Sequence, residues 1–176
     1  MHKSDRVLFI ICILVQLSLE DAVKIADVGV SKEEKMITGT MAGTPAFVAP
    51  EVIKSSVYDN KADIYSFGIM MWEMWYGKRA FMEVGGDLNT FWDRVVEGVR
   101  PCHIEGTRMP PDQLRNLMQR CWNGEADKRP TAATCHNELA KLYSTIFLSD
   151  VQLNVQQWLG VYVLNCFLKL SNDSSS

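Results

Sequence analysis

The sequence predicts a mainly α-helical fold with a short β-hairpin ahead of the helices. Three observations support this: one long segment that is apolar on every side, three shorter segments with an apolar stripe at helical spacing, and two short strand-like segments near the start. Because apolar helices and helical stripes must be covered, these segments predict one packed helical core. The 176 residues, 47% of them hydrophobic, suffice for one ordinary domain.

The clearest helix is expected between Asn60 and Gly77. Asn60 is a suitable N-cap, Asp63 takes the third helical position, and Gly77 is a usual C-terminal stop. The segment leaves almost no polar face, and its apolar residues are Ile64, Tyr65, Phe67, Ile69, Met70, Met71, Trp72, Met74 and Trp75. A helix that is apolar all round belongs in the middle of a domain. Polar interruptions argue against a membrane span, so we expect a buried scaffold helix.

Three amphipathic helices are expected to follow. Their stripes are Leu88, Phe91, Trp92, Val95 and Val96; Leu114, Leu117, Met118 and Cys121; and Cys135, Leu139, Leu142 and Ile146. Asp87, the pair Pro110–Pro111 and Thr131 mark their starts. We expect each stripe to face the core rather than a cofactor. The glycines and prolines of residues 94–111 predict a loop.

The start of the chain predicts the hairpin. Residues 13–17 and 23–26 are expected to be strands, joined by a turn at 18–21. The apolar run at 7–15 is too short to span a bilayer and has no secretory cleavage site after it. We expect residues 1–12 to be an atypical apolar start and residues 148–176 an atypical, partly disordered tail.

Composition excludes several classes of function. A net charge of −3 argues against a nucleic-acid surface. The five cysteines form no C-x-x-C pair, and with three histidines they offer no zinc-ligand spacing. We therefore expect reduced thiols in a cytoplasmic protein.

Two short motifs enclose a polar loop. Asp27-Val28-Gly29 follows the second predicted strand, where a carboxylate can hold a metal ion beside a phosphate, and Ala49-Pro50-Glu51 closes the loop. The pair resembles the D-F-G and A-P-E motifs of protein kinases. Asp63 to Gly68 is similar to the family's buried helix below the catalytic loop, and Cys121-Trp122 with residues 128–131 is similar to its closing Cys-Trp … Arg-Pro element.

The resemblance implies a fold. Residues 13–147 resemble the carboxy-terminal lobe of a protein kinase, with an activation segment at 27–51 and a helical lobe at 52–147. The Gly43–Pro45 stretch is similar to the substrate loop of Ser/Thr-type kinases, and the Ser66–Gly68 and Trp72–Glu73 stretches resemble the tyrosine-kinase-like branch. The resemblance therefore implies a tyrosine-kinase-like Ser/Thr type, similar to the dual serine/threonine and tyrosine protein kinase group. A glycine-rich loop and a strand lysine are missing from these residues, so we expect the upper lobe to be absent.

The resemblance also implies roles for individual residues. ATP and Mg²⁺ are the family's cofactors, with Asp27 as the metal ligand and Gly29 beside it in the cofactor site. Thr44 would line the substrate loop. Glu51 and Arg129 would form a structural ion pair, with Asp63 as a third structural residue. The candidate phosphorylation sites of the polar loop are Ser31, Thr38 and Thr40.

The family's catalytic loop is the main departure. Alignment of residues 5–12 with H-R-D-L-x-x-x-N puts Val7 at the catalytic aspartate and Cys12 at the metal-binding asparagine. Neither side chain can accept the substrate's proton or bind magnesium as this chemistry requires. Val28 also replaces the usual phenylalanine. No catalytic residue is intact, and we expect this chain alone to be inactive and to bind ATP and Mg²⁺ poorly.

Three hypotheses about function remain. In the first, the chain is a partial protein kinase domain, whose family phosphorylates Ser, Thr or Tyr of proteins in signalling. In the second, it is a lobe-only pseudokinase that binds protein substrates or a partner kinase through its helices and a groove at Thr44–Val48. In the third, its apolar runs make it membrane-attached or secreted, which the kinase-like body disfavours. Exposed apolar surface near Phe9, Ile10 and Val28 would favour self-association.

Overall fold

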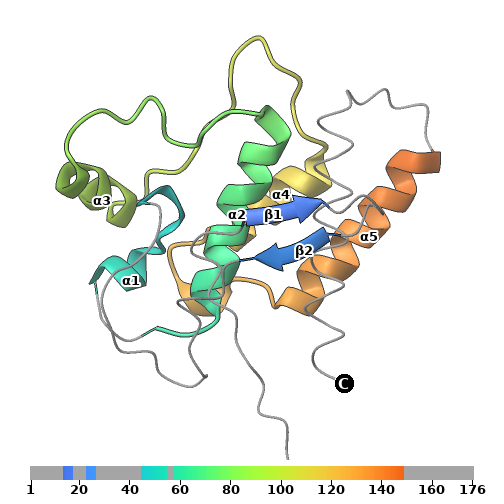
Figure 1. Ribbon diagram of the computed structural model, residues 1–176, viewed down its shortest axis with the longest axis horizontal. Helices are drawn as coiled ribbons and strands as arrows, with labels where there is room; N and C mark the ends of the chain where they lie inside the picture. Colours follow the sequence, from blue (N-terminus) through green and yellow to red (C-terminus); the bar gives the residue numbers. More distant parts are fainter. Residues whose placement is uncertain (1–13, 18–22, 27–44, 55–57, 149–176) are drawn as a thin grey trace, which may run out of the picture.

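The computed structural model describes residues 14–17, 23–26, 45–54 and 58–148, with the two strands and residues 146–148 described by their backbone alone (Figure 1). In chain order the elements are β1 (Leu14–Leu17), β2 (Val23–Ala26), the 3-10 helix η1 (Pro45–Phe47), α1 (Pro50–Lys54), α2 (Lys61–Tyr76), α3 (Leu88–Val96), α4 (Asp112–Cys121), the 3-10 helix η2 (Ala126–Lys128) and α5 (Ala132–Leu148). The mainly helical fold class is confirmed. The sequence did not predict α1, η1 or η2.

The two strands form the predicted hairpin. β1 pairs antiparallel with β2, and Leu14 lies opposite Ala26 while Leu17 lies opposite Val23. β2 ends at Ala26. The predicted turn and the polar loop after Asp27 lie outside the described residues.

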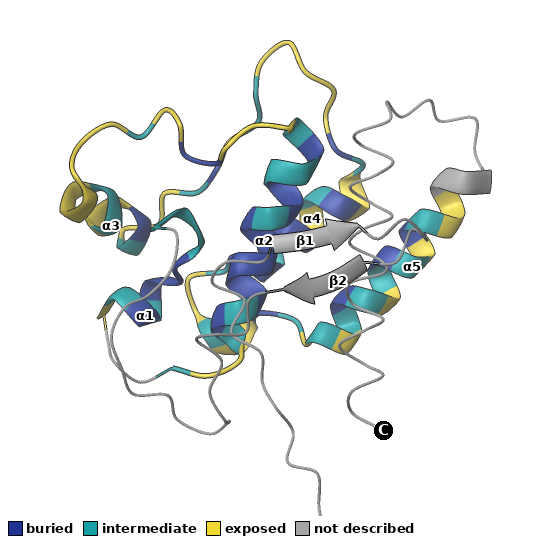
Figure 2. Ribbon diagram, in the orientation of Figure 1, coloured by how far each residue is buried: buried dark blue, intermediate teal, exposed yellow. Residues whose placement is uncertain are grey.

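Helix α2 runs through the centre of the fold, and Figure 2 shows it largely in the colour of buried residues. It packs against α4 and η1. Gly77 ends it as predicted: its φ of 62° is left-handed, and its N–H donates to the Glu73 carbonyl at 2.8 Å. The capping role predicted for Asn60 is wrong. The Asn60 side chain makes no capping bond, and the carboxylate of Asp59 accepts from Lys61 N at 2.9 Å instead.

Helices α4 and α5 bury the predicted stripes. All four apolar residues of α4 are buried, and so are Cys135, Leu139 and Leu142 of α5; the Ile146 side chain lies outside the description. Thr131 Oγ1 accepts from Thr134 N at 3.1 Å, as a helix cap does. Helix α4 approaches α2 at Gly68, where an added Cβ would lie 2.9 Å from Cys121 Cβ.

Helix α3 departs from the prediction. Of its stripe only Val95 is fully buried, while Leu88 is 45% exposed and Phe91 is half-buried. The expectation that the whole stripe faces the core is therefore wrong. The helix also continues to Val96, so the predicted loop begins at residue 97 rather than 94. Its Asp87 cap is present, since Asp87 Oδ1 accepts from Thr90 N at 2.8 Å.

Candidate functional site

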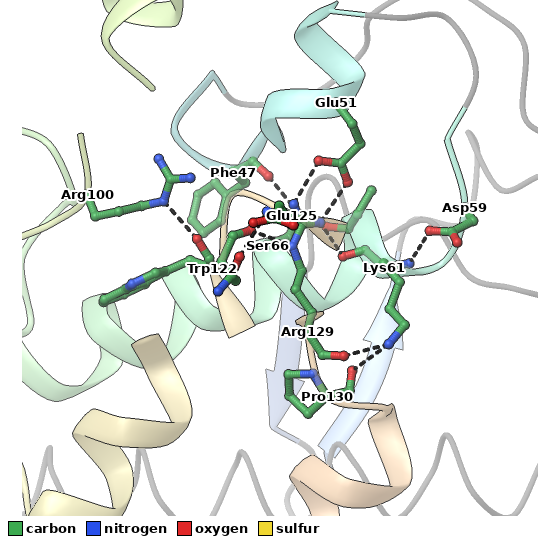
Figure 3. Close-up of polar contacts among 12 residues, drawn as sticks. Phe47, Glu51, Asp59, Lys61, Ser66, Arg100, Trp122, Glu125, Arg129 and Pro130 are labelled. Atoms are coloured by element: carbon green, nitrogen blue, oxygen red, sulfur yellow. Dashed lines mark hydrogen bonds and ion pairs between the residues drawn. The ribbon is translucent and has the colours of Figure 1, made fainter. Parts of the chain in front are cut away.

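The 3-10 helix η1 is fixed to the central helix α2. Ser66 Oγ of α2 donates a hydrogen bond of 2.7 Å to the carbonyl of Phe47 in η1. Pro50 then begins α1, where a proline is tolerated because its missing N–H has no helical partner. This arrangement places Glu51 in the first turn of α1, pointing toward Arg129 (Figure 3).

Glu51 and Arg129 form a bidentate ion pair. Arg129 Nη1 donates to Glu51 Oε1 at 2.6 Å, and Nη2 donates to Oε2 at 2.7 Å. The arginine side chain is 0% exposed and the glutamate side chain 23%. The planar guanidinium matches both carboxylate oxygens, which lysine cannot do. A buried charge of this kind is tolerated only when it is fully paired.

Two further N–H donors of Arg129 go to backbone carbonyls. Nε donates to Asn123 O at 2.9 Å, and Nη1 also donates to Lys61 O at 2.7 Å. Lys61 returns the contact, since its Nζ donates to Arg129 O at 2.6 Å and to Pro130 O at 3.4 Å (Figure 3). The pair therefore joins α1, the start of α2 and the segment before α5.

A second arginine extends this cluster toward α3. The guanidinium carbons of Arg100 and Arg129 lie 5.1 and 5.2 Å from the ring centre of the buried Tyr65. Burial raises the pKa of Tyr65 to about 12, although both arginines oppose that change. Arg100 also donates to Trp122 O and Val95 O, each at 2.8 Å, and its burial lowers its pKa.

The described residues also enclose an open groove of about 550 Å³. Its walls are η1, the end of α2, the connection from Arg79 to Asp87, and the start of α3. Phe81 of the connection is buried, takes the left-handed conformation with φ 61°, and packs edge-on against Phe91 of α3 with ring centres 5.3 Å apart. Left-handed backbone is unfavourable for a bulky residue and is often found at functional sites.

The structure brings together two of the residues singled out from the sequence, Glu51 and Arg129. Asp63 lies in the first turn of α2 and is half-buried. The other candidates, namely Asp27, Gly29, Ser31, Thr38, Thr40 and Thr44, lie outside the described residues, as do Val7, Cys12, Val28 and the apolar surface near Phe9 and Ile10.

Sequence reasoning missed Arg100, Lys61 and most of the groove wall; of that wall it anticipated only the Thr44–Val48 stretch, from which Pro45, Ala46 and Phe47 line the groove. Arg100 and the groove residue Arg79 stand in aperiodic connections, where no spacing signals a role. One sequence feature could have indicated the groove: the apolar stripe of α3 has five residues, although the helix buries only Val95. In the described part of the chain, no three His, Cys, Asp or Glu side chains gather in a way that could hold a metal. The same part contains no helix with the length and apolar character needed to cross a bilayer.

Comparisons with known proteins agree with this architecture. The profile of the family described as protein tyrosine and serine/threonine kinase matches residues 10–139. The chain belongs to the protein kinase family. This confirms the resemblance found in the motifs.

Three relatives illustrate the match. A serine/threonine-protein kinase/receptor of Acanthamoeba polyphaga mimivirus is 40% identical over 114 residues, covering 62% of this chain and 6% of the relative. The dual serine/threonine and tyrosine protein kinase of Takifugu rubripes is 36% identical over 122 residues, covering 66% and 12%. Its namesake in Strongylocentrotus purpuratus is 36% identical over 137 residues, covering 74% and 14%. The chain thus spans 14% or less of the length of these relatives.

Proposed function

We propose that this chain is the part of a protein kinase domain that binds the polypeptide substrate, in a family that transfers a phosphoryl group from ATP to Ser, Thr or Tyr residues of signalling proteins. One observation supports this most directly: Ser66 and the Glu51–Arg129 pair fix η1 and α1 next to an open groove. A rigid wall beside a groove is what positioning a peptide requires.

The cofactor side of the proposal rests on Asp27 and Gly29. β2 ends at Ala26, so the next residue emerges at the end of a strand, and a carboxylate is the ligand that Mg²⁺ prefers. We propose that Asp27 holds the magnesium ion and Gly29 lets the backbone approach the phosphates. ATP supplies the phosphoryl group in this family.

A second candidate function is a binding module without catalysis. The groove and its supporting ion pair consist of described residues, whereas Val7 and Cys12 stand at the family's catalytic aspartate and asparagine. These 176 residues also contain no glycine-rich phosphate loop. We propose that the chain taken by itself binds peptides but does not phosphorylate them. Its partners would then be protein substrates or another kinase.

Both candidates are tested with the purified 176-residue chain. Labelled peptides report binding by fluorescence anisotropy, and transfer of phosphate from ATP to a generic acceptor protein reports catalysis. We expect binding without transfer, and we expect Leu88→Ala, which shortens an exposed apolar side chain of the groove wall, to weaken binding. Val99→Ala, at an exposed apolar residue that does not line the groove, is the matched control. Phosphate transfer would refute the binding-module candidate, and a folded chain that binds no peptide would refute the groove's role.

We further propose a cytoplasmic location, because the ATP and the substrate proteins of signalling kinases are found there. Fractionation of cells that express the tagged protein tests this. Recovery in a secreted or membrane fraction would overturn it and would support the third hypothesis instead.

A further inference from the structure

The groove carries more chemical information than its shape. Aromatic and aliphatic side chains make up much of its wall: Phe47 from η1, Phe81 and Val84 from the connection, and Leu88 and Phe91 from α3. Leu88, at the start of α3, is 45% exposed. An exposed apolar side chain in a groove lined largely by apolar residues favours an occupant with a large apolar residue.

Three charged residues also line the groove, and two of them are already engaged. Glu73 Oε1 accepts from Ala80 N at 2.8 Å, and Asp87 Oδ1 accepts from Thr90 N at 2.8 Å. Those bonds close the turn after α2 and cap α3, so both carboxylates have a structural role. The bond from the Thr90 backbone lowers the pKa of Asp87, which keeps its carboxylate ionised.

Arg79 is the third charged residue, and it differs from the other two. It lies exposed on the groove and forms no hydrogen bond or ion pair with any residue in the described part of the chain. Among the described residues that line the groove, Arg79 is the only one with a positive charge. An arginine presents several N–H donors in a plane that fits a carboxylate.

We propose that this groove selects substrate segments in which a large apolar residue lies close to an aspartate or glutamate. The apolar side chain would fill the space between the aromatic walls, and the carboxylate would pair with Arg79. The inference rests on the proposed substrate-binding function and specifies its substrate class. Arg79 is the specificity-determining residue in this arrangement.

Peptide binding to the 176-residue chain tests the inference. The probes are fluorescent peptides with one fixed leucine and one aspartate, moved position by position along either side of it, with matched asparagine and lysine sets. We expect the best aspartate peptide to bind roughly threefold to fivefold more tightly than its lysine counterpart at low salt, the range of an exposed ion pair. The preference should fall at high salt, because exposed charges are screened.

Two charge reversals locate the selecting residue. Arg79→Glu should reverse the preference, so that lysine peptides bind more tightly. Lys78→Glu changes the net charge equally at an exposed neighbour that does not line the groove, and it should keep the aspartate preference. Circular dichroism checks that both variants remain folded.

The remaining outcomes are distinguishable. Equal affinity for the three peptide sets would overturn the inference and leave the groove as a peptide site. A preference of the wild-type chain for lysine peptides would also overturn the inference, because it would show that Glu73 and Asp87 outweigh Arg79 in the charge of the groove. If no peptide binds at all, the proposed substrate-binding function fails together with the inference.

Discussion

Arg129 and Glu51 are 78 residues apart in the sequence, yet their side chains meet through two parallel hydrogen bonds of 2.6 and 2.7 Å. The contact joins two distant parts of the described helical region, since Glu51 lies in α1 and Arg129 lies between η2 and α5. Arg129 also bonds the backbone of Asn123 and Lys61. Loss of the Glu51 carboxylate would therefore leave the buried Arg129 guanidinium bonded only to backbone carbonyl groups.

Removing the carboxylate should be costly. We expect Glu51→Ala to lower the free energy of unfolding by about 3–5 kcal/mol, because it leaves the charge of Arg129 buried without its counterion. Urea unfolding followed by circular dichroism measures the change. Arg129→Lys should also destabilise the protein, since an ammonium group cannot make both bonds to Glu51.

An exposed pair provides the control. Lys128 Nζ lies 2.6 Å from Glu125 Oε1, but the two side chains are 60% and 70% exposed. Glu125→Ala should therefore change stability by no more than about 1 kcal/mol. Similar losses in Glu51→Ala and Glu125→Ala would contradict the structural role of the Glu51–Arg129 pair.

The packing of α2 against α4 should be sensitive to any side chain added at Gly68. A Cβ at this position would lie 2.9 Å from Cys121 Cβ and 3.3 Å from Trp122 N, so α2 and α4 would have to separate. We expect Gly68→Ala to destabilise the fold by up to about 2 kcal/mol, since overpacking costs about 1–3 kcal/mol and the alanine returns about 1 through its helix propensity.

Gly85→Ala is the matched change, because a Cβ there meets nothing within 4 Å. It should leave the thermal unfolding midpoint nearly unchanged or raise it slightly. A Gly68→Ala protein as stable as Gly85→Ala would show that the two helices do not approach as closely as described.

The helical core could be predicted because periodicity reports directly on burial. The stripe of α4 is buried at all four positions, and Gly77 ends α2 in the left-handed conformation that favours glycine. The same rule failed for Leu88, which has helical spacing but lines a groove. Periodicity identifies a covered face of a helix but not what covers it.

Local polar contacts were harder to predict. Asp59 and Asn60 are both good caps, and only the path of the chain decides that Asp59 bonds Lys61 N. The role of Arg100 depends on carbonyls of Val95 and Trp122, which no sequence pattern brings together. The pairing of Glu51 with Arg129 was expected from the family resemblance and not from their spacing.

The described cysteines should differ in reactivity. Cys121 and Cys135 are buried with their sulfur atoms 3.7 Å apart, whereas Cys102 is exposed. The contact with Cys135 and burial raise the pKa of the Cys121 thiol, so little thiolate forms. We expect iodoacetamide to modify Cys102 in the native protein, and Cys121 and Cys135 only after unfolding. Peptide mass spectrometry gives the site, and equal labelling of Cys102 and Cys121 in the native protein would contradict the packing of α4 on α5.

Tyr65 should make stability depend on pH in the alkaline range. Burial raises its pKa from 10.0 to about 12 in the folded protein. Below pH 10 the phenol is neutral in both states, and its contribution to stability is fully present. Between pH 10 and 12 the unfolded chain loses the proton while the folded chain keeps it, so the free energy of unfolding falls as the pH rises.

Tyr65→Phe isolates this contribution. The Tyr65 hydroxyl is buried and has no hydrogen-bond partner in the described part of the chain, so its removal should leave stability at pH 7 unchanged or slightly higher. The phenylalanine ring still lies against Arg100 and Arg129.

Because Tyr58 and Tyr76 also have raised pKa values and remain in both proteins, the difference between wild type and variant reports on Tyr65 alone. Urea unfolding at pH 7 and at intervals from pH 9 to 12 should show wild type losing stability faster than the variant above pH 10; parallel curves would mean that Tyr65 ionises as readily in the folded protein as in the unfolded chain.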